Sequence, residues 1–189
     1  MKKDISDEEI DQLAYHNIDL KVLKKIANPF NGCWIELEKP ITIKEVKNCI
    51  AENKAELVIT PSWYDIAFKK VKLTQEEIRE NHIKKIAFFA INDMKEPISI
   101  DVGIPSLGSY VDHIVDDGNH RLAGAIVSGK KTIKAKISGS VEHAKSLGLW
   151  NPNEYEIESE KRFMTKFDNK EKLEKAEVKS IKQPKLKIN

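Results

Sequence analysis

The chain has 189 residues, of which 40% are hydrophobic, and this suits one compact domain with an extension. Its formal charge is only +2, so the whole molecule is not an obvious polyanion binder, although residues 161–189 carry ten basic and four acidic side chains. Cys33 and Cys49 are too few for a disulfide framework and lack metal-binding spacing, and no apolar run is long enough to span a membrane. We therefore expect a cytoplasmic protein that does not associate with membranes.

Capping boxes predict where three helices begin, because a Ser or Thr hydroxyl and a Glu three residues later satisfy each other's free backbone amides. The pattern occurs at Ser6, Thr42 and Thr74. Apolar residues follow each box at helical spacing. The first box predicts either two helices or one helix with a break near Asn17, ending at Ile26. The other predicted helices run from Ile43 to Asn53 and from Gln75 to Ile91.

Runs of β-branched and other apolar residues predict strands between and after these helices. Two of the runs alternate apolar and polar side chains, which is the pattern of a half-exposed strand. The others are short apolar runs next to Gly, Pro or Asp residues. The predicted strands are 33–37, 56–60, 98–102, 114–115 and 132–137.

The junction after residues 114–115 has an unusual charge pattern. Gly118 permits a tight turn, and apolar residues at helical spacing predict a helix from Asn119 onward. A helix N-terminus carries free N–H groups and a partial positive charge, so acidic residues favour its first turn. His120 and Arg121 occupy that turn instead.

Two interpretations of these basic residues stay open. In the first, His120 and Arg121 point to solvent or pair with Asp116 or Asp117. In the second, a phosphate group bound to the free amides makes the basic side chains favourable.

Together the elements predict an α/β (α+β) fold with a small mixed sheet. We expect a helical N-terminal extension over residues 1–55 and a central domain over residues 56–139. Residues 140–189 should form a basic tail, helical and partly disordered, which begins with a short helix capped by Ser140.

Three segments of the central domain are PISIDV at 97–102, HIVDDGNHRLAGAIVSG at 113–129 and KKTIKAKISG at 130–139. In this order they resemble the ParB/sulfiredoxin superfamily, and with the preceding helix the likeness covers roughly residues 67–139. The DGNHR motif is similar to the Asp-Gly-His-His-Arg motif of archaeal free-serine kinases. Asn119 stands where sulfiredoxins have their catalytic cysteine, so sulfiredoxin activity is not expected.

The resemblance implies a sheet of the ParB/sulfiredoxin type and a bound nucleotide, ATP, ADP or CTP, used in NTP hydrolysis or phosphoryl transfer. His120, Asp117 and Asp116 are the candidate catalytic residues, and Asp116 is also the candidate ligand for Mg²⁺. Asp117 has an alternative role as a turn residue that bonds its own backbone. The residues expected to hold the phosphate are Gly118, Asn119, His120 and Arg121.

Other polar residues carry weaker expectations. Glu36 and Glu38 are candidate bases for activating an acceptor, although alternation in a half-exposed strand explains them equally well. His16, His82 and His143 fall in predicted helices, where we expect surface or packing roles.

Two other functions stay open. A DNA-binding or DNA-cleaving ParB-like protein would use the basic tail to contact phosphates, and its binding would depend strongly on salt. No convincing helix-turn-helix pair follows Gly139, which puts a full partition function in doubt. A non-catalytic module that binds a partner is the third possibility.

Overall fold

A four-stranded mixed sheet organises the chain in a computed structural model, which describes residues 15–61, 65, 68, 72–93, 95–152, 157, 158, 161, 162 and 165. The strand order is β1–β4–β2–β3. β1 is antiparallel to β4, β4 is parallel to β2, and β2 is antiparallel to β3. The mixed α/β class is therefore confirmed. The strands are β1 (Tyr15–Asp19), β2 (Ile98–Asp101), β3 (Val115–Asp117) and β4 (Thr132–Ser138).

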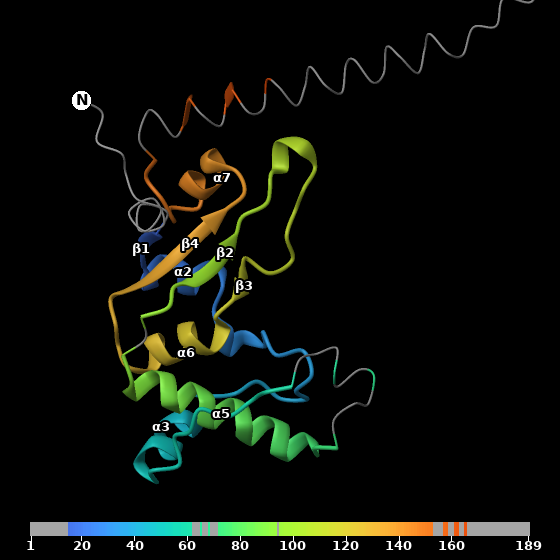
Figure 1. The fold of residues 1–189 in the computed structure, drawn as a ribbon, viewed down its shortest axis with the longest axis vertical. Helices are drawn as coiled ribbons and strands as arrows, with labels where there is room; N and C mark the ends of the chain where they lie inside the picture. Colours follow the sequence, from blue (N-terminus) through green and yellow to red (C-terminus); the bar gives the residue numbers. More distant parts are fainter. Residues whose placement is uncertain are drawn as a thin grey trace, which may run out of the picture.

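The helices form layers beneath and beside the sheet. Figure 1 shows α6 between the sheet and α5, with α3 against α5 on the far side from α6. Two short 3-10 helices, η1 and η2, occupy connecting loops. The helices are α2 (Leu20–Ile26), η1 (Pro29–Asn31), α3 (Ile43–Ala51), α5 (Gln75–Ile91), η2 (Pro105–Leu107), α6 (Asn119–Val127) and α7 (Val141–Ser146).

Helix α6 contributes to two hydrophobic cores. Leu122 and Ala125 pack with the sheet, while Ala123 packs with α3 and α5. Gly124 has no side chain where α6 meets α5, and a Cβ there would lie 2.7 Å from the Cβ of Phe89. The small residues of α6 therefore let the two helices approach closely, and this brings the first turn of α6 against the middle of α5.

Several sequence predictions are confirmed. Thr42 and Thr74 cap α3 and α5, and each makes both hydrogen bonds of its capping box. Strands β2 and β4 lie where alternation predicted them, and α6 begins at Asn119 as expected. The strand predicted at 114–115 is shifted: β3 begins at Val115 and continues to Asp117. Ser140 caps α7 by accepting a hydrogen bond from the amide of His143.

The helix predicted up to Ile26 is wrong in its middle part. Residues 15–19 form β1, and each pairs with a residue of β4, from Tyr15 with Lys136 to Asp19 with Thr132. The pairing buries Ile18, which is 1% exposed, in the core with the sheet. Tertiary pairing thus overrides the local helical pattern. The capping box at Ser6 lies outside the described residues.

The strands predicted at 33–37 and 56–60 are also wrong, because the structure has turns and irregular backbone there. At 33–37 the chain forms a turn, in which the amide of Leu37 donates to the carbonyl of Trp34 at 3.1 Å. At 56–60 Leu57 and Ile59 are exposed and Val58 is half-buried, and the amide of Val58 donates to the carbonyl of Glu56 at 3.0 Å in a local turn.

The predicted C-terminal tail lies mostly outside the described residues. Residues 157, 158, 161, 162 and 165 are helical, and those after 165 are not described. Among the described residues, no helix combines the length and apolar character needed to cross a membrane.

Candidate functional site

The turn from β3 to α6 requires a glycine. Gly118 is the N-cap of α6 and has a φ of 95°, in the left-handed region that favours glycine. A Cβ at this position would lie 2.6 Å from Ile98 Cγ2 and 3.0 Å from Arg121 Nε. The turn is thus held tightly between β2 and the side chain of Arg121, which fixes where α6 begins.

The first turn of α6 has free amides and no acidic neighbour within the helix. No side chain caps it, and it contains no Asp or Glu. Asn119 uses its Nδ2 to donate to the carbonyl of Val115, 3.3 Å away, so its side chain braces β3. A helix end of this kind retains the partial positive charge of its free N–H groups.

The amides open onto a hollow of about 310 Å³, which we call the basic hollow. Its lining includes the cations Lys85 and Arg121, together with His120 and the exposed carboxylates of Asp116 and Asp117. Lys85 comes from α5, where its Nζ donates to Thr60 Oγ1 at 3.1 Å, and burial lowers the pKa of Lys85. The full lining of the basic hollow is Trp34, Lys85, Phe89 and residues 116–121.

Arg121 is held by two exposed carboxylates. Its Nη1 donates to Glu96 and its Nη2 donates to Asp117, at 2.8 and 2.7 Å. Both carboxylate side chains are 75% exposed, whereas that of Arg121 is 13% exposed. Arg121 Nε is buried without a hydrogen-bond partner among the described residues. The guanidinium thus lies fixed at the turn by two of its N–H groups, and its buried Nε–H has no partner among the described residues.

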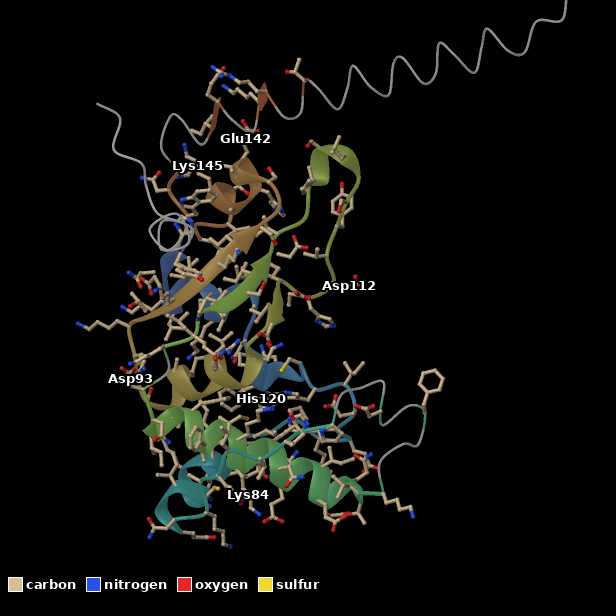
Figure 2. All side chains as sticks on the ribbon, viewed as in Figure 1. Lys84, Asp93, Asp112, His120, Glu142 and Lys145 are labelled. Atoms are coloured by element: carbon tan, nitrogen blue, oxygen red, sulfur yellow. The ribbon has the colours of Figure 1, made fainter. Side chains whose placement is uncertain are left out.

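Two histidines meet edge to edge in the space between α5 and α6. The Nδ1 of His82 and the Nε2 of His120 are 2.7 Å apart, and the rings are 4.9 Å apart and nearly parallel. His82 is 2% exposed, and His120 lines the basic hollow. Figure 2 shows His120 at the boundary between the two helices. The close approach of α5 and α6 produces this contact.

Behind the histidines lies a buried carboxylate. Glu36 Oε1 is 3.0 Å from His82 Nε2, and the Glu36 side chain is 9% exposed. The oxygen lies away from the N–H direction of the ring, so this is a close electrostatic contact rather than a straight hydrogen bond, and it becomes an ion pair when His82 is protonated. Burial alone would raise the pKa of Glu36, but the contact with His82 and the Glu36 backbone amide together lower it.

The surroundings keep His120 neutral. Burial, the positive charges that His82 and Lys85 can carry, and that of Arg121 lower the pKa of His120 to about 2. Trp34 covers both imidazoles, with its ring centre 5.4 Å from that of His82 and 5.3 Å from that of His120. Glu36, His82 and His120 therefore form a line from a buried carboxylate to an accessible imidazole, which we call the His–His line.

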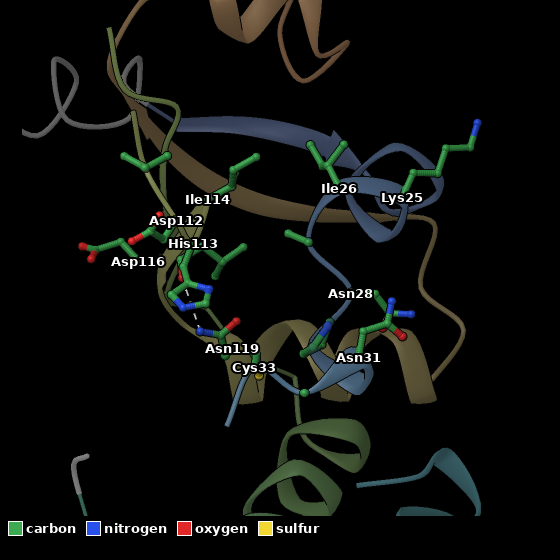
Figure 3. Close-up of a pocket in the computed structure, with 15 residues that line it drawn as sticks. Lys25, Ile26, Asn28, Asn31, Cys33, Asp112, His113, Ile114, Asp116 and Asn119 are labelled. Carbon is green, nitrogen blue, oxygen red and sulfur yellow. Dashed lines mark hydrogen bonds between the residues drawn. The ribbon is translucent and has the colours of Figure 1, made fainter. Parts of the chain in front are cut away.

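A second hollow of about 510 Å³ lies on the other side of the start of α6. Figure 3 shows Asn28 and Asn31 on one wall, with His113 and Asp116 on the opposite one. Asp116 and Asn119 line both hollows, so the β3–α6 turn separates them.

The structure gathers most of the expected site residues around one turn. Residues Gly118 to Arg121 all line the basic hollow, and Asp117 pairs with Arg121 as the first interpretation of the charge pattern anticipated. Asp116 is exposed between the two hollows. Among the described residues, no group of three or more His, Cys, Asp or Glu side chains is placed to hold a metal ion.

Sequence reasoning missed the partner of His120. His82 was expected to be a surface or packing residue, and it is instead the link between Glu36 and His120. One signal was present: His82 stands midway between Ile78 and Ile86, four residues from each, on the buried stripe of α5. A titratable residue on such a stripe needs a polar partner. Of the two glutamates considered as bases, Glu36 reaches the site, whereas Glu38 is exposed.

Comparisons with known proteins add no family to this description. No protein-family model matches the chain, and no curated protein and no solved structure gives a significant match.

Proposed function

We propose that the chain binds a nucleotide by its phosphates at the start of α6 and catalyses NTP hydrolysis or phosphoryl transfer there. One observation carries the proposal: a helix N-terminus with no side-chain cap and no acid in its first turn opens onto a hollow that holds Lys85, His120 and Arg121. Free amides together with cationic side chains are the usual protein surroundings of a phosphate.

The chain order also supports a domain of the ParB/sulfiredoxin type. Strand β2, strand β3, the DGNHR turn, helix α6 and strand β4 follow one another as the resemblance implies. In this proposal the backbone amides of Asn119 and His120 bind phosphate oxygens, and Gly118 permits the left-handed turn from which these amides follow.

Arg121 supplies a positively charged hydrogen-bond donor for the phosphate. Its two carboxylate partners are mostly exposed, so solvent screens both pairs and each contributes little to stability. A phosphate can therefore replace one carboxylate at the guanidinium. Lys85 adds a second cation from the opposite wall.

His120 is the group that accepts a proton from the attacking water or from an acceptor hydroxyl. Its low pKa keeps the imidazole neutral, and a bound phosphate opposes the neighbouring positive charges that lower this pKa. Asp116, exposed at the rim, is the carboxylate available to a magnesium ion that arrives with the phosphates.

Nothing in the described residues favours DNA over a nucleotide. The basic tail on which DNA binding depends lies mostly outside them. DNA binding and a non-catalytic partner module stay predictions of the sequence.

Calorimetric titration with ATP, ADP, CTP and GTP in the presence of magnesium tests the proposal. We expect Arg121→Ala to weaken the binding of the preferred nucleotide roughly ten- to a hundredfold, since a hydrogen bond to a charged group contributes about 1.5–3 kcal/mol. Lys85→Ala should weaken it as well.

Lys84→Ala is the matched control, because Lys84 is the neighbouring residue on α5, pairs with Glu80 and does not line the basic hollow. Equal binding by the Arg121, Lys85 and Lys84 variants would contradict the proposal, and so would the absence of binding to any of the four nucleotides.

A further inference from the structure

The proton positions in the His–His line can be assigned one after another, starting from the buried carboxylate of Glu36. Glu36 is ionised at neutral pH because its pKa is lowered. The Glu36 oxygen lies 3.0 Å from His82 Nε2 but off the N–H direction, and its negative charge favours a hydrogen on that nitrogen over a lone pair. His82 therefore has its proton on Nε2 when it is neutral, which leaves Nδ1 as an acceptor.

The contact between His82 and His120 determines which ring nitrogen of His120 carries the proton. Because His82 Nδ1 accepts, the Nε2 of His120, 2.7 Å away, must donate. Neutral His120 then has its proton on Nε2 and a bare Nδ1. Among the described residues this is the one hydrogen bond of the His120 ring, so Nδ1 is free to accept a proton.

The charges around the two rings differ in sign. Lys85 from α5 and Arg121 from α6 lie near His120 and disfavour a cation there. Glu36 faces His82 from the loop after η1 and favours a cation on that ring. Asp117 is engaged with Arg121.

The Cys33 thiol, which also lies near Glu36, stays neutral. Burial and the Glu36 charge raise the pKa of this thiol to about 12. It therefore adds no competing charge around neutral pH.

We infer that Glu36, His82 and His120 form a proton relay. In it His120 binds an incoming proton at Nδ1, its Nε2–H bond breaks, and that proton forms a new bond to His82 Nδ1. The ring of His120 ends neutral with its proton on Nδ1, and the single positive charge resides on His82 beside the Glu36 carboxylate.

The relay explains how a histidine in a cationic hollow works as a base. His120 would hold a proton poorly by itself, but it passes the charge to a ring that a carboxylate stabilises and that Trp34 covers. Glu36 and His82 are thus positioning residues that act through His120. The use of the relay in turnover rests on the proposed function, whereas its proton uptake is a property of the free protein.

Nitrogen NMR of the ¹⁵N-histidine-labelled chain tests the inference without nucleotide. The chain has five histidines, which single His→Gln variants assign. At neutral pH we expect His82 and His120 both to carry their proton on Nε2. On acidification one proton should enter the pair, and both rings should change in the same step. A neutral His120 with its proton on Nε2 throughout, or two rings that titrate independently, would overturn the relay.

Glu36→Gln sharpens the test because it removes the carboxylate charge and keeps a side chain of similar size. The pH at which the His82–His120 pair takes up one proton should fall by a unit or more. Glu36→Asp, which keeps the charge, should bring this pH back most of the way. Glu38→Gln, an exposed neighbour, is the control and should leave the step in place. An unchanged step in Glu36→Gln would contradict the inference.

A separate measurement links the relay to turnover. If the relay serves the reaction, Glu36→Gln should move the acidic limb of the plot of kcat/KM against pH to lower pH, and it should reduce kcat. If Glu36 had only a structural role, the pH of this limb would stay unchanged. Failure of the chain to bind nucleotide would contradict only the proposed function, because the histidine NMR experiment contains none.

Discussion

Two charged networks meet at the start of α6, and they differ mainly in burial. The His–His line runs from Glu36 through His82 to His120, with side chains that are 9% and 2% exposed at its inner end. The second network joins Glu96, Arg121 and Asp117, with both carboxylates 75% exposed. Each network places carboxylates against nitrogen groups at 2.7–3.0 Å, so contact distance alone does not distinguish them.

The difference in burial suits the two networks to different functions. A buried pair lacks water to replace a missing partner, so each group dictates the protonation of the next. A pair at the surface is screened and can exchange one partner for another anion. The buried network thus suits proton handling, and the exposed one suits reversible binding of a phosphate.

The largest expected effect comes from breaking the buried network. His82→Ala leaves the Glu36 carboxylate without its partner and leaves His120 Nε2 unbonded, and we expect it to lower the free energy of unfolding by about 3–5 kcal/mol. Urea denaturation measures the loss. Asp117→Ala, which breaks an exposed pair, should cost less than about 1 kcal/mol. Similar losses in the two variants would contradict the contrast between the networks.

The second prediction concerns a substitution that should push apart α5 and α6, the helices that carry His82 and His120. In Gly124→Ala the new Cβ would lie 2.7 Å from Phe89, so α5 and α6 must move apart. We expect a loss of about 1–3 kcal/mol in urea denaturation, as for other overpacked cores. An open helix position would instead gain about 0.5–1 kcal/mol on the same change. The sign of the effect decides whether close packing holds the histidines together.

The third prediction concerns pH. The pKa of His120 is lowered to about 2 and that of Glu36 is also lowered, so the unfolded chain binds more protons than the folded one in acid. The stability contributed by neutral His120 is present above the ordinary histidine pKa of about 6.5 and is lost as pH falls below it.

The expected slope for His120 is at most about 1.4 kcal/mol per pH unit, and it should be measured by urea denaturation between pH 7 and pH 5. His120→Gln should flatten this part of the curve, because glutamine does not titrate. A slope in the variant equal to that of the unmodified chain would contradict the account.

The smallest effect on stability is expected in the exposed network. Glu96→Gln removes one charged partner of Arg121 and should change the free energy of unfolding by less than about 1 kcal/mol. The same change frees the guanidinium for a phosphate, so nucleotide affinity in calorimetry should rise a few-fold at low salt. Weaker binding in this variant would indicate that Glu96 holds Arg121 in its binding position instead of competing for it.

The local signals of the sequence located most of the elements next to the site. The capping box at Thr74 placed α5, and the Gly118 turn with apolar spacing placed α6. These signals work because caps and glycine turns act on neighbouring residues. They also identified His120 and Arg121 as unusual occupants of a first helical turn.

The remaining features depend on contacts between distant segments. β1 becomes a strand because β4 pairs with it, and no local pattern at 15–19 reveals that partner. Glu36 reaches His82 only because the loop after η1 folds over α5, and His82 reaches His120 only because Gly124 lets the helices approach. The sequence therefore pointed to the DGNHR turn and to Glu36 as a candidate base, but the role of His82 and the contacts that join Glu36 to His120 depend on the tertiary structure.

Binding of phosphate at the first turn of α6 is the central claim, and backbone amide NMR tests it most directly. The ¹⁵N-labelled chain is titrated with ATP and magnesium, and the amide signals of residues 119–121 are compared with those of Lys84 and Asp93, which lie outside the basic hollow. We predict that the signals of residues 119–121 shift most and that Arg121→Ala reduces the shifts at equal ATP concentration. Unchanged signals at residues 119–121 under saturating ATP would contradict the account.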